Sequence, residues 1–229
     1  MNLFYITPLI LQKLIWIPTR ILLKVLINLE IEGLENLRGI KRNVIFASNH
    51  VSELDPILLP ASLPFFSRFS PIYYASLKSD KYKNTGWRHN FYGGTFFKFW
   101  GAHPIYTGLK DYGKSLVDHE KLLIDKKNLF VFPEGRITLL GNIQPARGGV
   151  AYLRESVDCE IVPIAIIGAY GMTTSDFFFR RRKVRIIFGK PISGSELFDN
   201  VRRSVVPGEN VYKEEAEYVM KKVKGLMGN

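Results

Sequence analysis

The sequence predicts an α/β fold: a single layered domain with a mixed central sheet flanked by helices, preceded by an N-terminal amphipathic helical segment. Short apolar runs of strand length alternate along the chain with stretches of helical periodicity, a pattern typical of layered α/β domains. The 229 residues, 46% of them hydrophobic, are enough to bury one sizeable core. Because no repeat, low-complexity tract or linker interrupts residues 30–229, we expect one domain there, with residues 1–29 as a separate membrane-interface segment.

The first 29 residues are apolar apart from three cations and a few uncharged polar side chains. No uninterrupted apolar run approaches the ~20 residues of a spanning helix. On a continuous helix, the spacing of the cations confines them to an arc of about 40°, opposite four apolar residues. Pro8 and Pro18 are expected to divide the segment into short helices. The pattern favours a helical segment lying in the headgroup layer of a membrane, with core helices and solvated cations as the alternative. The cations are Lys13, Arg20 and Lys24, and the apolar residues are Leu11, Ile15, Leu22 and Leu26.

Strands and helices then follow in order. Apolar runs predict strands, and residues with helical spacing predict helices. The predicted strands are 44–47, 71–75, 103–106, 128–132, 160–168 and 183–188. The predicted helices begin at Ile57 and cover 109–125, 149–157 and 209–227.

The chain is strongly basic, with 32 Lys and Arg against 21 Asp and Glu and a net charge of +11. Such a surface suits nucleic acid or acidic lipids, but a nucleic-acid-binding protein would leave the apolar residues 1–29 unexplained, so we expect no nucleic acid. The single Cys159 excludes an intramolecular disulfide framework and a cysteine-based zinc site. Its place before an apolar run predicts a buried, inert thiol, compatible with the cytoplasmic side of a membrane.

Residues 48–56 are the first candidate for chemistry, because His50 precedes Asp55 by five positions at a strand-to-helix corner. In a regular helix that spacing would turn the side chains about 140° apart, so only an irregular turn lets Asp55 contact the His50 ring. The alternative makes Ser52 the N-cap of the helix, Asp55 the acidic half of a capping box and His50 an ordinary loop residue.

A second candidate is the turn at 132–135, Phe-Pro-Glu-Gly, which ends a predicted strand. It would place the carboxylate of Glu134 and free backbone amides at the carboxyl edge of the sheet, where open α/β sheets bind ligands. Arg136 and Arg147 flank Gly135 and could clamp a phosphate.

Taken together, these motifs resemble the glycerolipid acyltransferase family, the enzymes that acylate 1-acylglycerol 3-phosphate and its relatives. The resemblance runs from about residue 30 to the end of the chain, and five blocks occur in the order of the family. They are 49–56 (Asn-His-Val-Ser-Glu-Leu-Asp-Pro), 101–105 (Gly-Ala-His-Pro-Ile), 132–135 (Phe-Pro-Glu-Gly), 161–165 (Ile-Val-Pro-Ile-Ala) and 180–192.

The resemblance implies an O-acyltransferase of phospholipid biosynthesis. His50 would accept the proton of a glycerol hydroxyl, Asp55 would orient and stabilise the imidazole, and the hydroxyl would attack the thioester of acyl-CoA or acyl-carrier protein. Glu134, Gly135, and Arg136 or Arg147 would position the acceptor, 1-acylglycerol 3-phosphate. The family requires no metal and no cofactor beyond the acyl donor. Its partners would be membrane lipids, at the cytoplasmic face of the cell membrane.

Two positions depart from the family pattern. Thr107 stands where the second block usually carries an arginine, and Ile137 follows Arg136 where the third block usually has its arginine. Lys110, Lys78 and Arg147 are the candidates to replace these arginines. Two alternatives therefore stay open: an acyltransferase for a non-phosphate lyso-lipid acceptor, or a lipid-binding paralogue that is catalytically weak or inactive. The intact His50 and Asp55 argue against the second.

Three further features allow two interpretations each. Residues 91–100 contain six aromatics beside Gly93 and Gly94, which suits either core packing or the wall of a groove for a hydrocarbon chain. The cations at 180–183 follow three phenylalanines, 177–179, and form either a solvated tip or, as we favour, an edge that binds headgroups. His89, His103 and His119 are expected to be surface or packing residues, although His103 lies in the second block.

Overall fold

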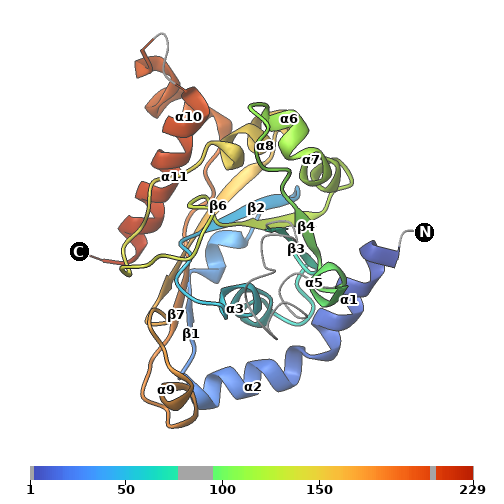
Figure 1. Cartoon of the computed structure of the whole chain (residues 1–229), viewed down its shortest axis with the longest axis vertical. Coiled ribbons are helices and arrows are strands. Elements are labelled where there is room, and N and C mark those ends of the chain that lie inside the picture. Colours follow the sequence, from blue (N-terminus) through green and yellow to red (C-terminus); the bar gives the residue numbers. More distant parts are fainter. Residues whose placement is uncertain (1–2, 77–94, 207–209, 229) are drawn as a thin grey trace.

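The computed structural model describes residues 3–76, 95–206 and 210–228, and it confirms the α/β fold with a mixed sheet. Seven strands lie in the order β1-β7-β6-β2-β5-β3-β4 (Figure 1). The five strands from β6 to β4 are parallel, whereas β7 is antiparallel to β6 and carries β1 at the outer edge. The strands are β1 (Glu30–Glu32), β2 (Val44–Ser48), β3 (Ile72–Ser76), β4 (Ala102–Pro104), β5 (Asn128–Val131), β6 (Glu160–Ile167) and β7 (Arg185–Phe188).

The helices predicted from Ile57, at 149–157 and at 209–227 are present as Asp55–Ser62, Gly149–Val157 and Val211–Leu226. The predicted helix 109–125 is divided into α6 and α7 at Leu116, and the Asp111 side chain caps α6 by accepting from the Lys114 amide (3.2 Å). A strand at β1 was not predicted, because its sequence reads as a polar connector. The helices are α1 (Leu3–Leu14), α2 (Trp16–Leu26), α3 (Asp55–Ser62), α5 (Thr95–Trp100), α6 (Tyr112–Ser115), α7 (Val117–Ile124), α8 (Gly149–Val157), α9 (Thr174–Phe178), α10 (Gly194–Asn200) and α11 (Val211–Leu226), with 3₁₀ turns at Leu34–Leu37 and Arg202–Ser204.

Helices cover both faces of the sheet, so its central strand is buried on both sides. Val44 and Phe46 of β2 belong to the core beneath α2 and α3, whereas Ile45 and Ala47 belong to the core beneath α7, α8 and α11 (Figure 1). This explains why β2 is a continuous apolar run without polar alternation.

The N-terminal helices are packed onto the domain. Gln12 of α1 is buried, and its amide donates to the carbonyl oxygens of Ile72 (2.8 Å) and Trp100 (3.0 Å). Its side-chain oxygen accepts from the Ile72 amide (2.9 Å). Gln12 therefore joins α1 to β3 and α5.

Two of the three cations, Lys13 and Arg20, contact groups of the protein. Arg20 donates to the Ala61 carbonyl oxygen (2.6 Å) and lies over the Trp16 ring, while the Lys13 ammonium lies 4.6 Å from the centroid of Phe65. Their long side chains turn back over the protein, where these partners hold the charged ends.

The outer face of these helices is apolar. We call it the α1–α2 stripe, and it consists of Ile10 (56% exposed), Leu14 (71%), Ile17 (56%), Ile21 (59%), Leu22 (49%) and Val25 (43%). Leu11, Ile15 and Leu26, on the side opposite the cations, pack against the core, as the alternative of core helices expected, whereas Leu22 is exposed. In the described part of the chain, no helix has both the length and the hydropathy needed to cross a membrane.

Several predicted features lie outside the described residues. These are Lys78, His89, the loop 78–90 that contains them, and Phe91 to Gly94 at the start of the aromatic run.

Candidate active site

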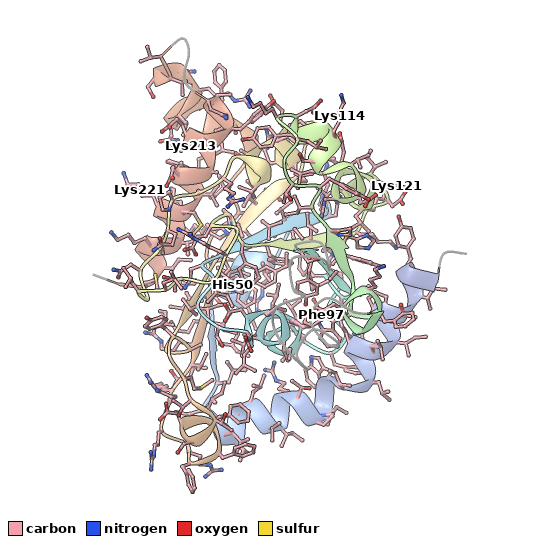
Figure 2. All side chains as sticks on the ribbon, viewed as in Figure 1. His50, Phe97, Lys114, Lys121, Lys213 and Lys221 are labelled. Atoms are coloured by element: carbon pink, nitrogen blue, oxygen red, sulfur yellow. The ribbon has the colours of Figure 1, made fainter. Side chains whose placement is uncertain are left out.

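The two candidate motifs meet at one edge of the sheet because β2 and β5 are adjacent and parallel, with Ala47 beside Val131. His50 follows the end of β2 by two residues, and Glu134 follows the end of β5 by three. Both therefore emerge at the carboxyl ends of neighbouring strands, where open α/β sheets place their sites. Figure 2 shows His50 at this edge.

His50 and Asp55 form a hydrogen bond, with His50 Nδ1 2.9 Å from Asp55 Oδ2. Asp55 is fully buried, whereas the His50 side chain is 16% exposed. The same carboxylate oxygen accepts from the amides of Val51 (2.7 Å) and Ser52 (2.9 Å). An ionised carboxylate can only accept, so the proton of a neutral His50 ring lies on Nδ1 and Nε2 is the free acceptor.

The irregular turn that this contact requires is present, since residues 49–54 are not helical and α3 begins at Asp55. The predicted capping box is only half formed. Asp55 accepts from the Ser52 amide, but the Ser52 hydroxyl accepts from the Leu54 amide (3.1 Å), and Leu54 is the N-cap residue. Asp55 therefore orders the turn and contacts His50 at the same time.

Phe132 fixes the plane of the imidazole. Its ring stacks on the His50 ring with centroids 3.8 Å apart and an angle of 11° between the planes. Because Phe132 follows β5 directly, the neighbouring strand supports the face of the ring while Asp55 holds one edge. The sequence motif contained Phe132, but nothing in its spacing predicted this contact.

Asn49 attaches the loop that carries His50 to strand β6. It is buried, and its side-chain amide donates to the Ile166 carbonyl oxygen while its side-chain oxygen accepts from the Ile166 amide, both at 2.8 Å. Ile166 lies near the end of β6, on the other side of β2 from β5. The sequence indicated Asn49 only through its place beside His50 in the first block.

Glu134 holds the loop from the β5 side. Its carboxylate accepts from the His50 amide (2.8 Å) and from the Gln144 amide (2.6 Å), and the side chain is buried. Burial raises the pKa of the Glu134 carboxyl, and the two amide hydrogen bonds oppose part of that rise. Glu134 is thus a positioning residue in this structure, and its contact with a substrate stays a prediction.

The structure brings Arg147 to the Pro-Glu-Gly turn. The Arg147 amide donates to the Pro133 carbonyl oxygen (2.8 Å), and its exposed side chain crosses Gly135. Gly135 has φ +71°, and a Cβ there would come within 3.0 Å of Arg147 Nε. The positive φ favours glycine at this position, and the exposed Arg147 side chain occupies the space beside it.

Among the described residues, the remaining positions that the sequence linked to phosphate binding have no such contact with the Pro-Glu-Gly turn. Arg136 is exposed, and no carboxylate in the described part of the chain pairs with its guanidinium. Thr107 and Lys110 lie in the exposed loop between β4 and α6. Ile137 lines a cavity.

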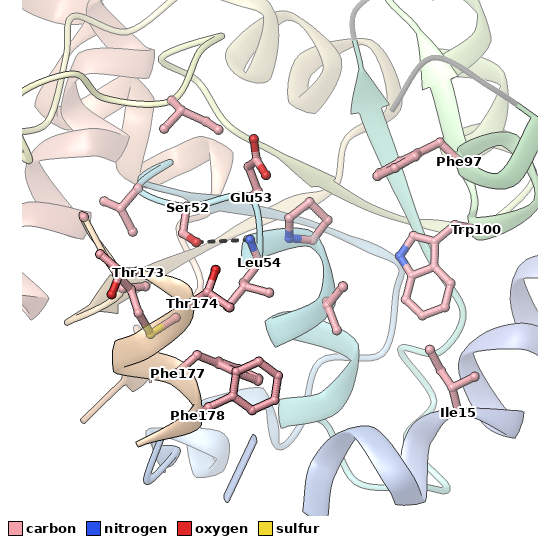
Figure 3. A pocket seen from close by; sticks show the side chains of 17 residues that line it. Ile15, Ser52, Glu53, Leu54, Phe97, Trp100, Thr173, Thr174, Phe177 and Phe178 are labelled. Carbon is pink, nitrogen blue, oxygen red and sulfur yellow. Dashed lines mark hydrogen bonds between the residues drawn. The ribbon is translucent and has the colours of Figure 1, made fainter. Parts of the chain in front are cut away.

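This cavity, with a volume of about 870 Å³, lies alongside the loop that carries His50. In Figure 3, Phe177 and Phe178 of α9 lie on one side of it and Phe97 and Trp100 of α5 on the other. Both interpretations of the aromatic run therefore stay open: Phe97 and Trp100 line the cavity, while Trp100 belongs to the core and Phe97 packs against it. Its walls are Ile15, Val51, Ser52, Glu53, Leu54, Pro56, Ile57, Phe97, Trp100, Ile137, Ala169, Gly171, Met172, Thr173, Thr174, Phe177 and Phe178.

His103 and His119 are packing residues in β4, at the edge of the sheet, and in α7. His119 is fully buried, and its Nε2 donates to the His103 carbonyl oxygen (3.1 Å). Burial lowers the pKa of His119 to about 4 and also lowers the pKa of His103. Both imidazoles are therefore neutral at pH 7.

Comparisons with known proteins agree with this arrangement. Residues 28–167 match the family model described as Acyltransferase, a range that includes the His50, Glu134 and Arg147 segments. The chain is 27% identical over 190 residues to the protein named 1-acyl-sn-glycerol-3-phosphate acyltransferase BAT2, chloroplastic, of Brassica napus. The match covers 80% of this chain and 51% of that protein, so the chain spans about half the length of this relative.

A solved structure has the same fold. It is the 1-acyl-sn-glycerophosphate (LPA) acyltransferase PlsC from Thermotoga maritima, with a TM-score of 0.59 and 16% sequence identity. The match covers 95% of this chain and 82% of that one.

Proposed function

The chain belongs to the Acyltransferase family, and on this premise we propose that it moves a fatty acyl group from a thioester donor to a glycerol hydroxyl of a lysophospholipid. The observation that carries the proposal is the 2.9 Å contact of His50 with buried Asp55, next to an apolar cavity of about 870 Å³. A base and a site for a hydrocarbon chain are the two components that such a transfer needs.

The geometry supports a direct transfer. Nε2 of His50 takes the proton of the acceptor hydroxyl as the hydroxyl oxygen bonds to the acyl carbon, and Asp55 stabilises the imidazolium. The thioester C–S bond then breaks, and the imidazolium returns the proton to the departing thiolate. The products are an ester and a free thiol of CoA or acyl-carrier protein. Phe132 and Asn49 hold the base in place, so little reorganisation is needed during the reaction.

The cavity suits the acyl chain. Aliphatic and aromatic side chains dominate its walls, and no lysine or arginine is among the wall residues of the described chain. Burial of a hydrocarbon contributes about 0.8 kcal/mol for each methylene.

For the acceptor we propose 1-acylglycerol 3-phosphate, with Arg147 and Arg136 at the Gly135 turn as the phosphate-binding groups. A guanidinium can bind two phosphate oxygens at once. A lyso-lipid without a phosphate monoester is the second candidate, and the place of Ile137 in the apolar wall favours it. Thr107 also offers no charge to a phosphate.

We further propose that the protein works in phospholipid biosynthesis as a peripheral or monotopic protein at the cytoplasmic face of the cell membrane. The α1–α2 stripe supports this proposal, because six exposed apolar residues on two consecutive helices suit the headgroup boundary of a bilayer. The net charge of +11 suits acidic lipids.

A transfer assay tests the proposal. Purified protein is given acyl-CoA or acyl-carrier-protein donors with a panel of lyso-lipids, and products are identified by mass spectrometry. We expect transfer to lysophosphatidic acid and its loss in His50→Ala, with an unchanged melting temperature. Transfer only to acceptors without a phosphate monoester would select the second candidate. Full activity of His50→Ala, or no transfer with any pair, would refute the proposed chemistry.

A further inference from the structure

The tip of α9 exposes two phenylalanines in front of a basic cluster. Phe178 is 62% exposed and Phe179 is 70% exposed, and residues 180–183 are Arg-Arg-Arg-Lys. Two adjacent aromatic rings in water are unfavourable unless something covers them.

Only part of the basic cluster is neutralised within the protein. Arg182 pairs with Asp176 (3.4 Å), and Lys183 pairs with Glu30 (2.7 Å). The guanidinium of Arg181 lies 5.5 Å from the centroid of the Phe179 ring, and no carboxylate in the described part of the chain pairs with Arg180 or Arg181. The tip therefore presents two unneutralised charges beside two apolar rings.

The tip lies next to the α1–α2 stripe. The Val184 amide donates to the Ile27 carbonyl oxygen (3.0 Å), and Lys183 reaches Glu30, so the strand after the tip is attached to the chain that leaves α2. In Figure 1, α9 lies beside the end of α2, on the side of the molecule opposite α6 and α10.

The tip is also at the rim of the cavity. Phe177 and Phe178 line the cavity together with Ile15, which joins α1 to α2 (Figure 3). One short segment thus connects the wall of the cavity with an exposed aromatic and cationic surface.

We propose that the α9 tip, Phe178 to Arg181, is a second membrane-attachment element that selects anionic lipids and seats the rim of the cavity on the bilayer. The rings would enter the interface beside the α1–α2 stripe, while Arg180 and Arg181 bind lipid phosphates. A bilayer fits better than an acidic carrier protein, because a carrier would match the charges but would leave the adjoining apolar stripe uncovered. This proposal rests on the membrane location proposed above, but vesicle binding can be measured without acyl transfer.

Sedimentation with vesicles tests the attachment. The full chain is mixed with vesicles of phosphatidylcholine alone, or of phosphatidylcholine with phosphatidylglycerol, at low and high salt. Wild-type binding is expected to increase with phosphatidylglycerol and to decrease with salt. Arg180→Gln with Arg181→Gln is expected to weaken binding to the anionic vesicles roughly 30-fold, with little effect on the neutral ones. Phe179→Ser is expected to weaken binding to both kinds, roughly fivefold.

Two matched controls separate the tip from general basicity. Lys213→Gln with Lys221→Gln removes the same charge from exposed positions on α11, which Figure 2 places far from α9. Phe198→Ser on α10 removes a ring that is 51% exposed and, like Phe179, lies beside an arginine, Arg203 (5.5 Å). Both controls are expected to bind vesicles as the wild type does.

Equal binding of the arginine variant and its control would overturn the proposal. So would normal vesicle binding by the arginine variant with loss of acyl-carrier-protein binding, since the tip would then contact the donor. Acyl transfer to a detergent-dispersed acceptor is measured in parallel and is expected to be unchanged. If the wild type transfers no acyl group but the vesicle results hold, the catalytic proposal fails and the attachment stands.

Discussion

The imidazole of His50 lies flat on the ring of Phe132, with ring centroids 3.8 Å apart, and the two residues follow the ends of the adjacent strands β2 and β5. With Asp55 at Nδ1, this stacking leaves the ring one orientation. Phe132→Leu is expected to lower kcat about tenfold and to leave KM nearly unchanged, because the base loses its orientation while the substrate contacts remain. Leu129→Ala is the control, because this side chain of β5 belongs to the core on the other face of the sheet, and it should lower stability without that effect on kcat. Equal kcat losses in both variants would show that Phe132 acts only through stability.

Asp55→Asn is expected to lower kcat by a factor of about 10² to 10⁴, because His50 loses the carboxylate that orients it as a base. The carboxylate oxygen accepts three hydrogen bonds, from the ring of His50 and from the amides of Val51 and Ser52. A side-chain amide would also place donors against this cluster, so the free energy of unfolding should fall by about 1–3 kcal/mol. Steady-state kinetics and urea unfolding measure the two effects. Wild-type kcat in this variant would exclude Asp55 as the partner of the base.

Thr174→Trp is expected to shift donor preference toward shorter acyl chains. Thr174 is exposed at the start of α9 and lines the cavity, so a larger side chain there narrows the space for hydrocarbon. Each methylene that is excluded should reduce kcat/KM about fourfold. Competition between donors of different chain length measures this preference. Ser175→Trp, the next residue, does not line the cavity and should keep the wild-type preference.

Ile17→Asn with Ile21→Asn is expected to weaken binding to vesicles of any headgroup, because both residues belong to the apolar α1–α2 stripe. The loss should be at least tenfold by sedimentation. The matched control is Val117→Asn with Ile124→Asn on α7, which are 50% and 62% exposed and lie on a helix that covers the other face of the sheet from α2. Unchanged vesicle binding by the Ile17→Asn, Ile21→Asn variant would show that the α1–α2 stripe does not contact the membrane.

Protein stability should fall as the pH decreases from about 6.5 toward 4. The folded-state pKa of His119 is lowered to about 4. Between about pH 6.5 and 4 the unfolded chain therefore binds a proton at this histidine that the folded chain does not bind, which favours unfolding. The slope for one such group is about 1.4 kcal/mol per pH unit. His103 shifts in the same direction, and Asp118, the nearby carboxylate, opposes both shifts.

His119→Phe should flatten this slope in urea unfolding measured across the same pH range. It should also cost about 1 kcal/mol at pH 7, because the His103 carbonyl oxygen loses its donor. A variant with the wild-type slope would show that other groups cause the acid destabilisation.

The sequence alone determined the features that depend on near neighbours. The apolar run at 44–47 predicts the buried β2, and the next residues place His50 and Asp55 at a strand-to-helix turn. The five ordered blocks predict the family, which the match of residues 28–167 confirms. Position next to a strand end is a local property, so it can be read from the order of residues.

The tertiary structure decided which distant segments meet. The order of strands places Phe132 and Glu134 beside His50 and lets Asn49 reach Ile166, 117 residues away. It also decided that Lys13 and Arg20 turn inward. Helical periodicity shows which residues share a face, but which face is buried depends on the partners that packing supplies, here the Ala61 carbonyl oxygen and the rings of Trp16 and Phe65.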